Sequence, residues 1–315
     1  MTQSLKIGVS ACLLGEHVRY DGGHKRDRYI TDTLGAYFSF VPVCPEVGCG
    51  LSTPREVMRL EGDASAPRLM TRQTRIDRTD QMLLFCSARI SELENEDLCG
   101  FIFKKDSPSS GLFRVKVYNN GQAVKNGRGL FAAAMVCHFP LLPMEEEGRL
   151  NDPEIRENFI ERIFSYRRWK DFLSEAPTMG RLVEFHTGNK LLMMAHSPQI
   201  YREMGVLVAH GSEMKQADLF LRYEELFMKG LVLQATVKKN TNVLQHIMGY
   251  FKQQLSSAEK AELLEVVSQY HNRFVPLIVP ITLLRHYINK YDQQYLKGQV
   301  YLAPHPAQLM LRNHV

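Results

Sequence analysis

The chain has 315 residues, 44% of them hydrophobic and 23% charged, which is typical of a globular protein large enough for two domains. No apolar run approaches the ~20 residues that a membrane span needs, and the polar start at Met1–Lys6 is too short for a signal peptide. Six cysteines without an export signal therefore predict a cytoplasmic protein whose cysteines are free thiols or metal ligands.

The formal net charge of +5 is unevenly placed along the chain. Residues 1–148 hold 18 Lys/Arg and 18 Asp/Glu, whereas residues 149–315 hold 21 and 16, together with eight of the eleven histidines. The whole excess lies in the second half. Such an excess is a feature of proteins that bind polyanions, although ordinary surface charge has the same appearance.

The first half begins with the alternation of a parallel α/β unit. Leu5–Ala11 has a strand pattern that leads to Cys12, and Asp27–Tyr37 has a helical pattern. The apolar run that ends at Val43 is a second strand, and Cys44 follows it. Because ligands bind beyond the carboxyl ends of parallel strands, we expect the two thiols to meet there.

Two polar segments accompany these strands. The glycine-rich loop from Arg19 to Lys25 either cradles an anion with its cationic ends or is a solvated turn. The segment Cys44–Cys49 places two thiols and the Glu46 carboxylate at a strand exit, where Pro45 and glycines favour a turn. Such a turn directs two sulfurs at one ligand, or it buries two small apolar side chains.

The patterns that follow complete an α/β domain. They predict a strand at Leu98–Phe103, which leads into Lys104–Gly111, a loop dense in hydroxyls and lysines. Cys99 begins this strand, so a rise of ~3.3 Å per residue places it far from the strand's exit. Further patterns predict helices at Asp77–Glu94 and Leu130–Phe139, a hairpin within Leu60–Thr71 and a strand at Arg114–Tyr118.

The segment Pro140–Pro153 marks a domain boundary, because prolines and a glycine surround the acidic run Glu145–Glu147. We therefore predict an α/β domain with a Rossmann-like parallel sheet at residues 1–148 and an all-α helical bundle at 149–315. The expected helices are Glu154–Leu173, Thr178–Ser197, Pro198–Ala209, Glu213–Lys238, Thr241–Gln254, Ser257–Val275 and Ile281–Tyr295.

The helical half mixes basic and aromatic residues in a way that suits RNA phosphates and bases, although solvated helix faces have a similar composition. The candidate RNA contacts are Arg167, Arg168, Lys170, Lys238 and Lys239.

Three cysteine thiolates around one loop system suit a soft metal. A structural zinc site needs four ligands, for which His17 and His24 are candidates, and an iron–sulfur cluster usually takes four cysteines. With Cys12, Cys44 and Cys49 alone, one iron stays open. An open iron beside Glu46 and the hydroxyls of Ser107–Ser110 would form an active site in which the carboxylate moves protons. A nucleophilic cysteine is the other catalytic option, and its base is not identified.

Several motifs resemble the thiouracil desulfidase (TudS-like) family, over residues 1 to about 140. They are Ser10-Ala11-Cys12-Leu13-Leu14-Gly15, Val18-Arg19-Tyr20-Asp21-Gly22, Cys44-Pro45-Glu46-Val47, Thr53-Pro54-Arg55 and Ser107-Pro108-Ser109-Ser110-Gly111. The helical remainder is similar to the uncharacterised YbgA-type domain. The combination resembles bacterial desulfidases that remove sulfur from 4-thiouridine in tRNA.

This resemblance implies a [4Fe-4S] cluster on three cysteines, whose open iron binds the thiocarbonyl sulfur. Water replaces the sulfur at the ring carbon and sulfide leaves, without net redox change. Cys12 and Cys44 match cluster ligands, Glu46 the catalytic acid/base, and Ser107 the serine that places water or substrate. We also expect the loop residues Arg19, Lys25, Ser109 and Ser110 to bind the substrate.

One position departs from the family pattern. The third ligand lies in a Ser-Pro-Ser-Cys-Gly motif, in which this chain has Ser110 instead of cysteine. Cys49 is the expected replacement, because it lies on the loop that already carries Cys44, and Cys99 is the alternative.

Two other functions fit the same sequence. In the first, the enzyme desulfurises free thiouracil or thiouridine nucleotides, and the helical domain serves stability or dimerisation. In the second, the chain is a non-enzymatic, metal-stabilised nucleic-acid-binding protein. The sequence leaves the oligomeric state open.

Overall fold

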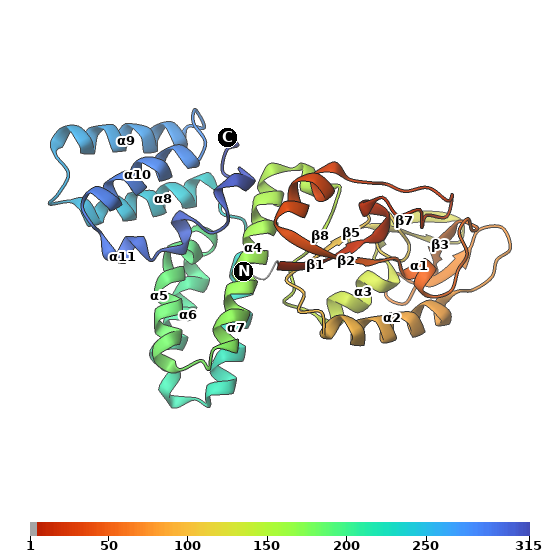
Figure 1. Ribbon diagram of the computed structural model, residues 1–315. Coiled ribbons are helices and arrows are strands. Elements are labelled where there is room, and N and C mark those ends of the chain that lie inside the picture. The colour runs from red at the N-terminus through yellow and green to blue at the C-terminus, as the bar shows by residue number, and fades with distance from the viewer. Residues whose placement is uncertain (1–4) are drawn as a thin grey trace. The chain divides into compact units, whose positions relative to one another are not determined.

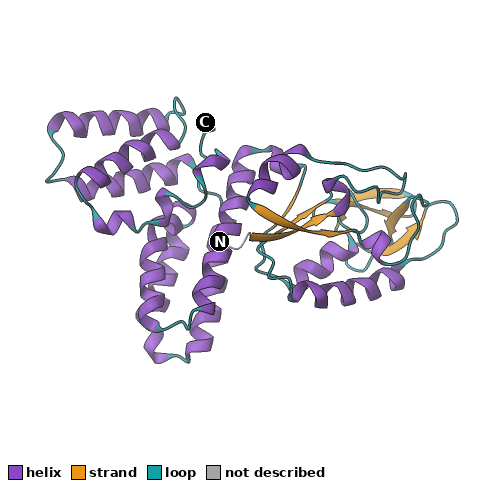
Figure 2. Ribbon diagram, in the orientation of Figure 1, coloured by secondary structure: helices purple, strands orange, loops and turns teal. Residues whose placement is uncertain are grey.

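The structure is a computed structural model that describes residues 5–315. The chain forms two compact units, Met1–Asp152 and Pro153–Val315, so the division falls within the segment Pro140–Pro153. The first unit combines strands and helices, and the second consists of helices and loops (Figure 2). The predicted α/β fold followed by an all-α region is therefore confirmed.

The first unit is built on a parallel four-stranded sheet with the order β2-β1-β5-β8 (Figure 1). β1 and β5 are largely buried, and β1 pairs with β2 so that Ser10 lies opposite Val43 at the carboxyl ends of the two strands. The helices α2 and α3 pack against each other beside this sheet. The bounds are β1 Leu5–Ser10, β2 Phe38–Val43, β5 Phe101–Phe103, β8 Met144–Glu146, α2 Thr79–Glu94 and α3 Leu130–His138.

A second, mixed sheet has the order β4-β3-β6-β7 and is formed by two hairpins. The hairpin within Leu60–Thr71 was predicted, and its strands β3 and β4 are antiparallel. The parallel pairing of β3 with β6 joins the two hairpins. The bounds are β3 Met58–Glu61, β4 Arg68–Thr71, β6 Val115–Asn119 and β7 Gln122–Gly127.

The connection between β1 and β2 differs from the regular helix that Asp27–Tyr37 predicted. It contains a short π-helix at Tyr29–Thr33 and a short 3₁₀ helix at Leu34–Ala36. Side chains of this stretch bond to the local backbone, as when Thr31 Oγ donates to the Asp27 carbonyl at 3.1 Å. Such bonds compete with a regular helix, and so the prediction fails here.

The acidic run lies within the segment in which the two units divide, but it is a folded part of the first unit. Glu145 and Glu146 belong to β8, the edge strand of the parallel sheet, and both are buried, as is Glu147. Buried carboxylates need partners, and backbone N–H groups supply them: Glu146 accepts from Leu112 N at 2.8 Å. The acidic residues therefore anchor loops of the first unit.

The second unit packs its helices around a core that includes the fully buried Trp169. The helix predicted over Glu213–Lys238 ends earlier, at Val232. The helix predicted from Thr241 begins earlier, at Val237, because Thr236 caps it by accepting from Lys239 N. The helix predicted at Ser257 begins with a capping box between Ser256 and Glu259. The bounds are α4 Pro153–Ser174, α5 Met179–His196, α6 Pro198–Ala209, α7 Gln216–Val232, α8 Val237–Met248, α9 Ser257–His271, α10 Ile278–Lys290 and α11 Gln294–Lys297.

Within residues 5–315, no helix combines the length and apolarity that crossing a membrane requires.

Candidate functional site

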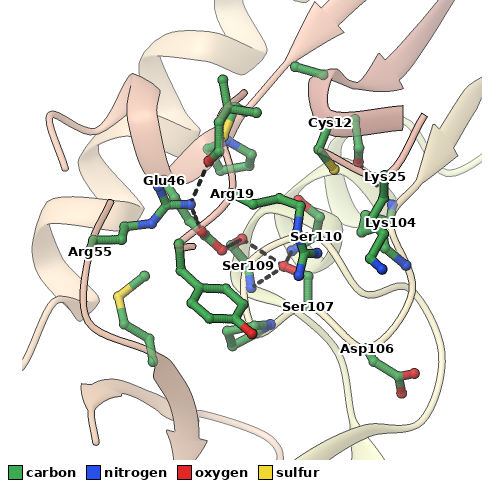
Figure 3. Close-up of a pocket in the computed structure, with 18 of the residues that line it drawn as sticks. Cys12, Arg19, Lys25, Glu46, Arg55, Lys104, Asp106, Ser107, Ser109 and Ser110 are labelled. Carbon is green, nitrogen blue, oxygen red and sulfur yellow. Dashed lines mark hydrogen bonds and ion pairs between the residues drawn. The ribbon is translucent and has the colours of Figure 1, made fainter. Parts of the chain in front are cut away.

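The carboxyl ends of the parallel strands open into a cavity of about 370 Å³ (Figure 3). Cys12 follows β1 by two positions and Cys44 follows β2 by one, and since these strands are neighbours both residues line the cavity. The expectation that the two strand ends bring these cysteines to one site is therefore confirmed. The other predicted site residues that line the cavity are Arg19, Lys25, Glu46, Ser107, Ser109 and Ser110.

Cys44 lies close enough to Cys12 to influence its ionisation. Burial and, to a smaller extent, Cys44 raise the pKa of Cys12 to about 11, although Lys104 and Arg19 act to lower it. Burial also raises the pKa of Cys44. Both sulfurs are therefore neutral thiols near pH 7 unless a bound cation stabilises the thiolates.

Glu46 lies on the short helix α1, Pro45–Gly48, which begins directly after Cys44. Its Oε1 accepts a hydrogen bond of 2.8 Å from Ser109 Oγ, and its Oε2 forms an ion pair with Arg55 (Figure 3). Arg55 is itself fixed, because its Nη2 also donates to the Val18 carbonyl at 2.9 Å. The carboxylate is thus held at both oxygens and faces the cavity in one orientation.

A hydroxyl relay runs along the serine loop to Glu46. Ser107 Oγ lies 3.0 Å from Ser109 Oγ and accepts from the backbone N–H of Ser110 at 3.1 Å. The start of α3 holds the loop, since Phe131 N donates to the Ser109 carbonyl at 2.9 Å. A side chain at Gly129 would collide with the Ser109 backbone at 2.5 Å, so glycine permits this close approach.

The edge strand β8 positions two further cations that line the cavity, Lys104 and Lys105. Glu147, directly after β8, ion-pairs with Lys104 and accepts from the backbone N–H of Lys105 at 2.8 Å. Lys104 N also donates to Ser10 Oγ at 2.9 Å, which connects the loop to the end of β1. These two lysines therefore give the cavity a basic wall, which suits an anionic ligand.

The third predicted cluster ligand is placed differently from the first two. Cys49 ends α1, does not line the cavity, and donates from its sulfur to the Glu46 carbonyl at 3.2 Å. Ser110, which is 4% exposed, lines the cavity with Cys12 and Cys44. The alternative ligand Cys99 lies at the opposite end of the sheet, where its backbone N–H bonds to Lys6 near the start of β1.

The predicted RNA contacts of the helical unit are mostly engaged within that unit. Arg168 donates to the Pro304 carbonyl and to Ser165 Oγ, both at 2.8 Å, and Lys239 donates to the carbonyls of His196 and Gln234. These two cations are therefore held as structural groups. Among the remaining candidates, Arg167 pairs with Asp171, Lys170 lies 5.7 Å from the Tyr166 ring centroid, and Lys238 is exposed.

Sequence reasoning did not assign roles to Arg55, Lys104, Lys105 or Glu147. The motif Thr53-Pro54-Arg55 pointed to the first, and the lysine-rich loop pointed to the next two. The direct contact of Ser109 with Glu46 depends on how two distant loops fold against each other, and no local pattern signals it.

Comparisons with known proteins agree with this division of the chain. Residues 7–147 match the family described as 2-thiouracil desulfurase, and residues 190–306 match DUF1722, a family described as of unknown function. The uncharacterised protein YbgA of Escherichia coli K12 is 28% identical over 165 residues, which are 52% of this chain and 98% of that protein. A solved structure, the [4Fe-4S]-dependent thiouracil desulfidase TudS, is 30% identical and covers 47% of this chain and 94% of its own, with a TM-score of 0.39. The chain therefore joins a domain of the 2-thiouracil desulfurase family, TudS-like in type, to a YbgA-type helical domain.

Proposed function

We propose that the protein is an iron–sulfur-dependent desulfidase that converts 4-thiouridine in tRNA to uridine and sulfide. The observation that carries the proposal is the cavity, where Cys12 and Cys44 lie with Glu46, the serine loop and basic side chains. The match of residues 7–147 to the 2-thiouracil desulfurase family supports the same chemistry.

The donor set of the cavity fits a [4Fe-4S] cluster. Two soft thiols from neighbouring strand ends are the ligands that iron–sulfur clusters take. Lys104 and Arg19 are close enough to favour the Cys12 thiolate, and Arg55 favours that of Cys44. For the third position the structure supports the Ser110 hydroxyl over Cys49, because Ser110 lines the cavity and Cys49 does not. A cluster on Cys12, Cys44 and Ser110 would keep one iron open to accept the sulfur of the substrate.

The reaction exchanges one atom at the ring. The thiocarbonyl carbon loses sulfur and gains the oxygen of one water molecule, and the two water protons leave with the sulfide as H₂S. No oxidant or reductant is needed. Glu46 is placed to take a proton from the attacking water and to return it to the departing sulfur, because both of its oxygens are held by Ser109 and Arg55.

The proposal names tRNA because of the second unit. All of the +5 excess lies beyond residue 148, and tRNA binding depends largely on Lys and Arg contacts to phosphate. A free thiolated nucleotide needs no such unit, since the cavity with its lysines belongs to the first unit alone.

The test is sulfide release by anaerobically reconstituted protein from three substrates at equal concentration: thiolated tRNA, free 4-thiouridine monophosphate and 2-thiouracil. We expect the highest kcat/KM with tRNA and salt-sensitive binding to it. Equal or better activity on the small substrates would assign the enzyme to free thiolated pyrimidines. Iron-loaded protein without sulfide release from any of them would contradict the enzymatic function itself.

A further inference from the structure

Six half-buried or exposed side chains of the helical unit form a closed ring that the catalytic cavity does not include. The members come from α5, α6, α8 and α11 and the turn after α8. They are His186, Lys190, Tyr201, His246, Tyr250 and Tyr295.

Ring contacts connect three of the six neighbouring pairs in this set, which we call the tyrosine–histidine ring. Burial and Tyr250 raise the pKa of the Tyr295 phenol, and Tyr201 lies close enough to raise it further. His246 lies edge-on to Tyr250 with centroids 5.7 Å apart, and Tyr250 stacks on Tyr295 at 5.2 Å. On the other side His186 stacks on Tyr201 at 5.9 Å with an interplanar angle of 7°. α5 packs against both α6 and α8, which brings the two halves together (Figure 1).

Lys190 is the cationic member of the ring. It lies one helical turn after His186 on α5, and its charge reaches both imidazoles: burial and Lys190 lower the pKa of His186 and of His246. Within residues 5–315, no carboxylate forms an ion pair or hydrogen bond with Lys190 or with the other five side chains. The ring therefore combines aromatic faces with a positive charge that no acidic side chain of the described chain neutralises.

This combination suits a nucleotide. A base stacks on a tyrosine face whatever its sequence, and a lysine among neutral imidazoles binds the attached phosphate. Tyr250 is 36% exposed, so part of this side chain is open to solvent although Tyr295 stacks on it. The ring also lies in the half of the chain that holds the whole positive excess, which a polyanion complements.

We propose that the tyrosine–histidine ring binds an unpaired nucleotide of the tRNA substrate, with the base on Tyr250 and the phosphate at Lys190. The inference rests on the proposed function, because it names where the second unit holds the same tRNA. We therefore expect the ring, and not Arg168 or Lys239, to contact the tRNA, since the cationic groups of these two residues are bonded within the unit.

The test measures binding of full-length reconstituted protein to the sulfur-free product tRNA, which is not turned over. We expect Tyr250→Ala to weaken the Kd about tenfold through lost stacking, and Tyr250→Phe to bind like the wild type. Lys190→Ala should weaken binding and reduce the slope of log K against log salt by about one. Phe274→Ala and Lys260→Ala are matched controls, because both side chains are exposed elsewhere in the unit, and we expect neither to change the Kd.

Activity on free 4-thiouridine monophosphate separates two kinds of failure. The ring variants should keep this activity, because the cavity belongs to the first unit. Denaturant unfolding of each variant beside the wild type checks that the helical unit still folds. If the wild type binds tRNA and both ring variants bind it as the controls do, the ring assignment is wrong and the proposed function stands. If the wild type neither binds tRNA nor releases sulfide from it, both fail. Should Tyr250→Ala unfold, comparing Tyr250→Leu with Tyr250→Phe decides whether an aromatic face is required.

Discussion

The hydroxyl of Ser109 donates a hydrogen bond of 2.8 Å to Oε1 of Glu46, although 63 positions separate the two residues. The contact joins the serine loop after β5 to the helix α1 after β2. Both segments leave the same edge of the sheet on either side of β1, and they meet across its carboxyl end. It leaves the carboxylate with one fixed orientation toward the cavity. The chemistry that we propose depends on this arrangement.

Glu46→Gln should keep the cluster and lose most turnover. The amide preserves the shape of the side chain but does not accept a proton from water, and general acid–base help is worth ~10²–10⁴-fold in rate. Iron content and kcat for sulfide release measure the two effects. Glu61→Gln is the matched control, since Glu61 does not line the cavity and pairs with Arg59 and Arg75. Near-normal kcat in the Glu46 variant would remove Glu46 from the mechanism.

Arg55→Lys should lower kcat without loss of iron. Lysine keeps the positive charge, but its single ammonium does not reproduce the two-nitrogen fork. In that fork Nη2 bonds Glu46 and the Val18 carbonyl, while Nη1 bonds the Ser52 carbonyl. We expect a loss on the order of 10–100-fold from a displaced carboxylate, together with a shifted pH–rate profile. Arg59→Lys, in the second sheet, should leave both unchanged. If Arg55 had only a structural role, Arg55→Lys would lower the stability of the protein and leave the pH–rate profile unchanged.

Iron content and the electron paramagnetic resonance spectrum of the reduced protein identify the third cluster ligand. Cys12→Ala and Cys44→Ala should lose the cluster. Ser110→Ala should lower bound iron and change the spectrum, and Ser110→Cys should bind the cluster more firmly, because thiolate is the softer ligand. Cys49→Ala should keep a full cluster, since its sulfur faces the Glu46 carbonyl.

The opposite pattern would favour Cys49, which the sequence suggested as the third cluster ligand. If Cys49→Ala loses iron while Ser110→Ala keeps it, α1 rearranges when the cluster binds and Cys49 is the ligand. Loss of iron in Cys99→Ala would require a different site, because Cys99 lies at the other end of the sheet.

Much of the first unit could be predicted because its signals are local. The apolar strands before Cys12 and Cys44, together with the parallel alternation, placed both thiols at one edge of the sheet. The strand position of Cys99 likewise predicted its distance from the site. The motif around Glu46 marked the correct loop.

What the sequence did not predict depends on contacts between distant segments. The run Glu145–Glu147 has the composition of a solvated linker, and it becomes a buried strand only because Lys104, Arg149 and backbone N–H groups satisfy its carboxylates. The basic cluster at Arg167–Lys170 has the composition of an RNA contact. In the folded unit Trp169 is core and Arg168 bonds to a carbonyl, which local composition does not reveal.

A buried ion network predicts how the second unit responds to acid. Glu161, which is 3% exposed, contacts His196 and lies 3.1 Å from Arg312 Nη2. Burial acts to raise its pKa, but His196 and Arg312 outweigh burial and lower the pKa below the ordinary 4.5. A lowered folded-state pKa means that this stabilisation is present above pH 4.5 and is lost as the pH falls below it.

Glu161→Gln should therefore destabilise the unit by about 3–5 kcal/mol at pH 7, because it leaves Arg312 and His196 short of a buried counter-charge. The difference from the wild type should shrink as the pH falls below 4.5. Denaturant unfolding at a series of pH values measures both effects. A difference that stays constant across the series would show that ionisation of Glu161 does not contribute.

The most direct test of the account is a single anaerobic reaction in ¹⁸O-labelled water between the reconstituted full-length protein and tRNA that carries 4-thiouridine. We expect one sulfide for each 4-thiouridine lost, uridine as the product after digestion of the tRNA, and ¹⁸O in its ring carbonyl. Intact 4-thiouridine in the tRNA, or sulfide without labelled uridine, would contradict hydrolytic desulfuration of tRNA by this protein.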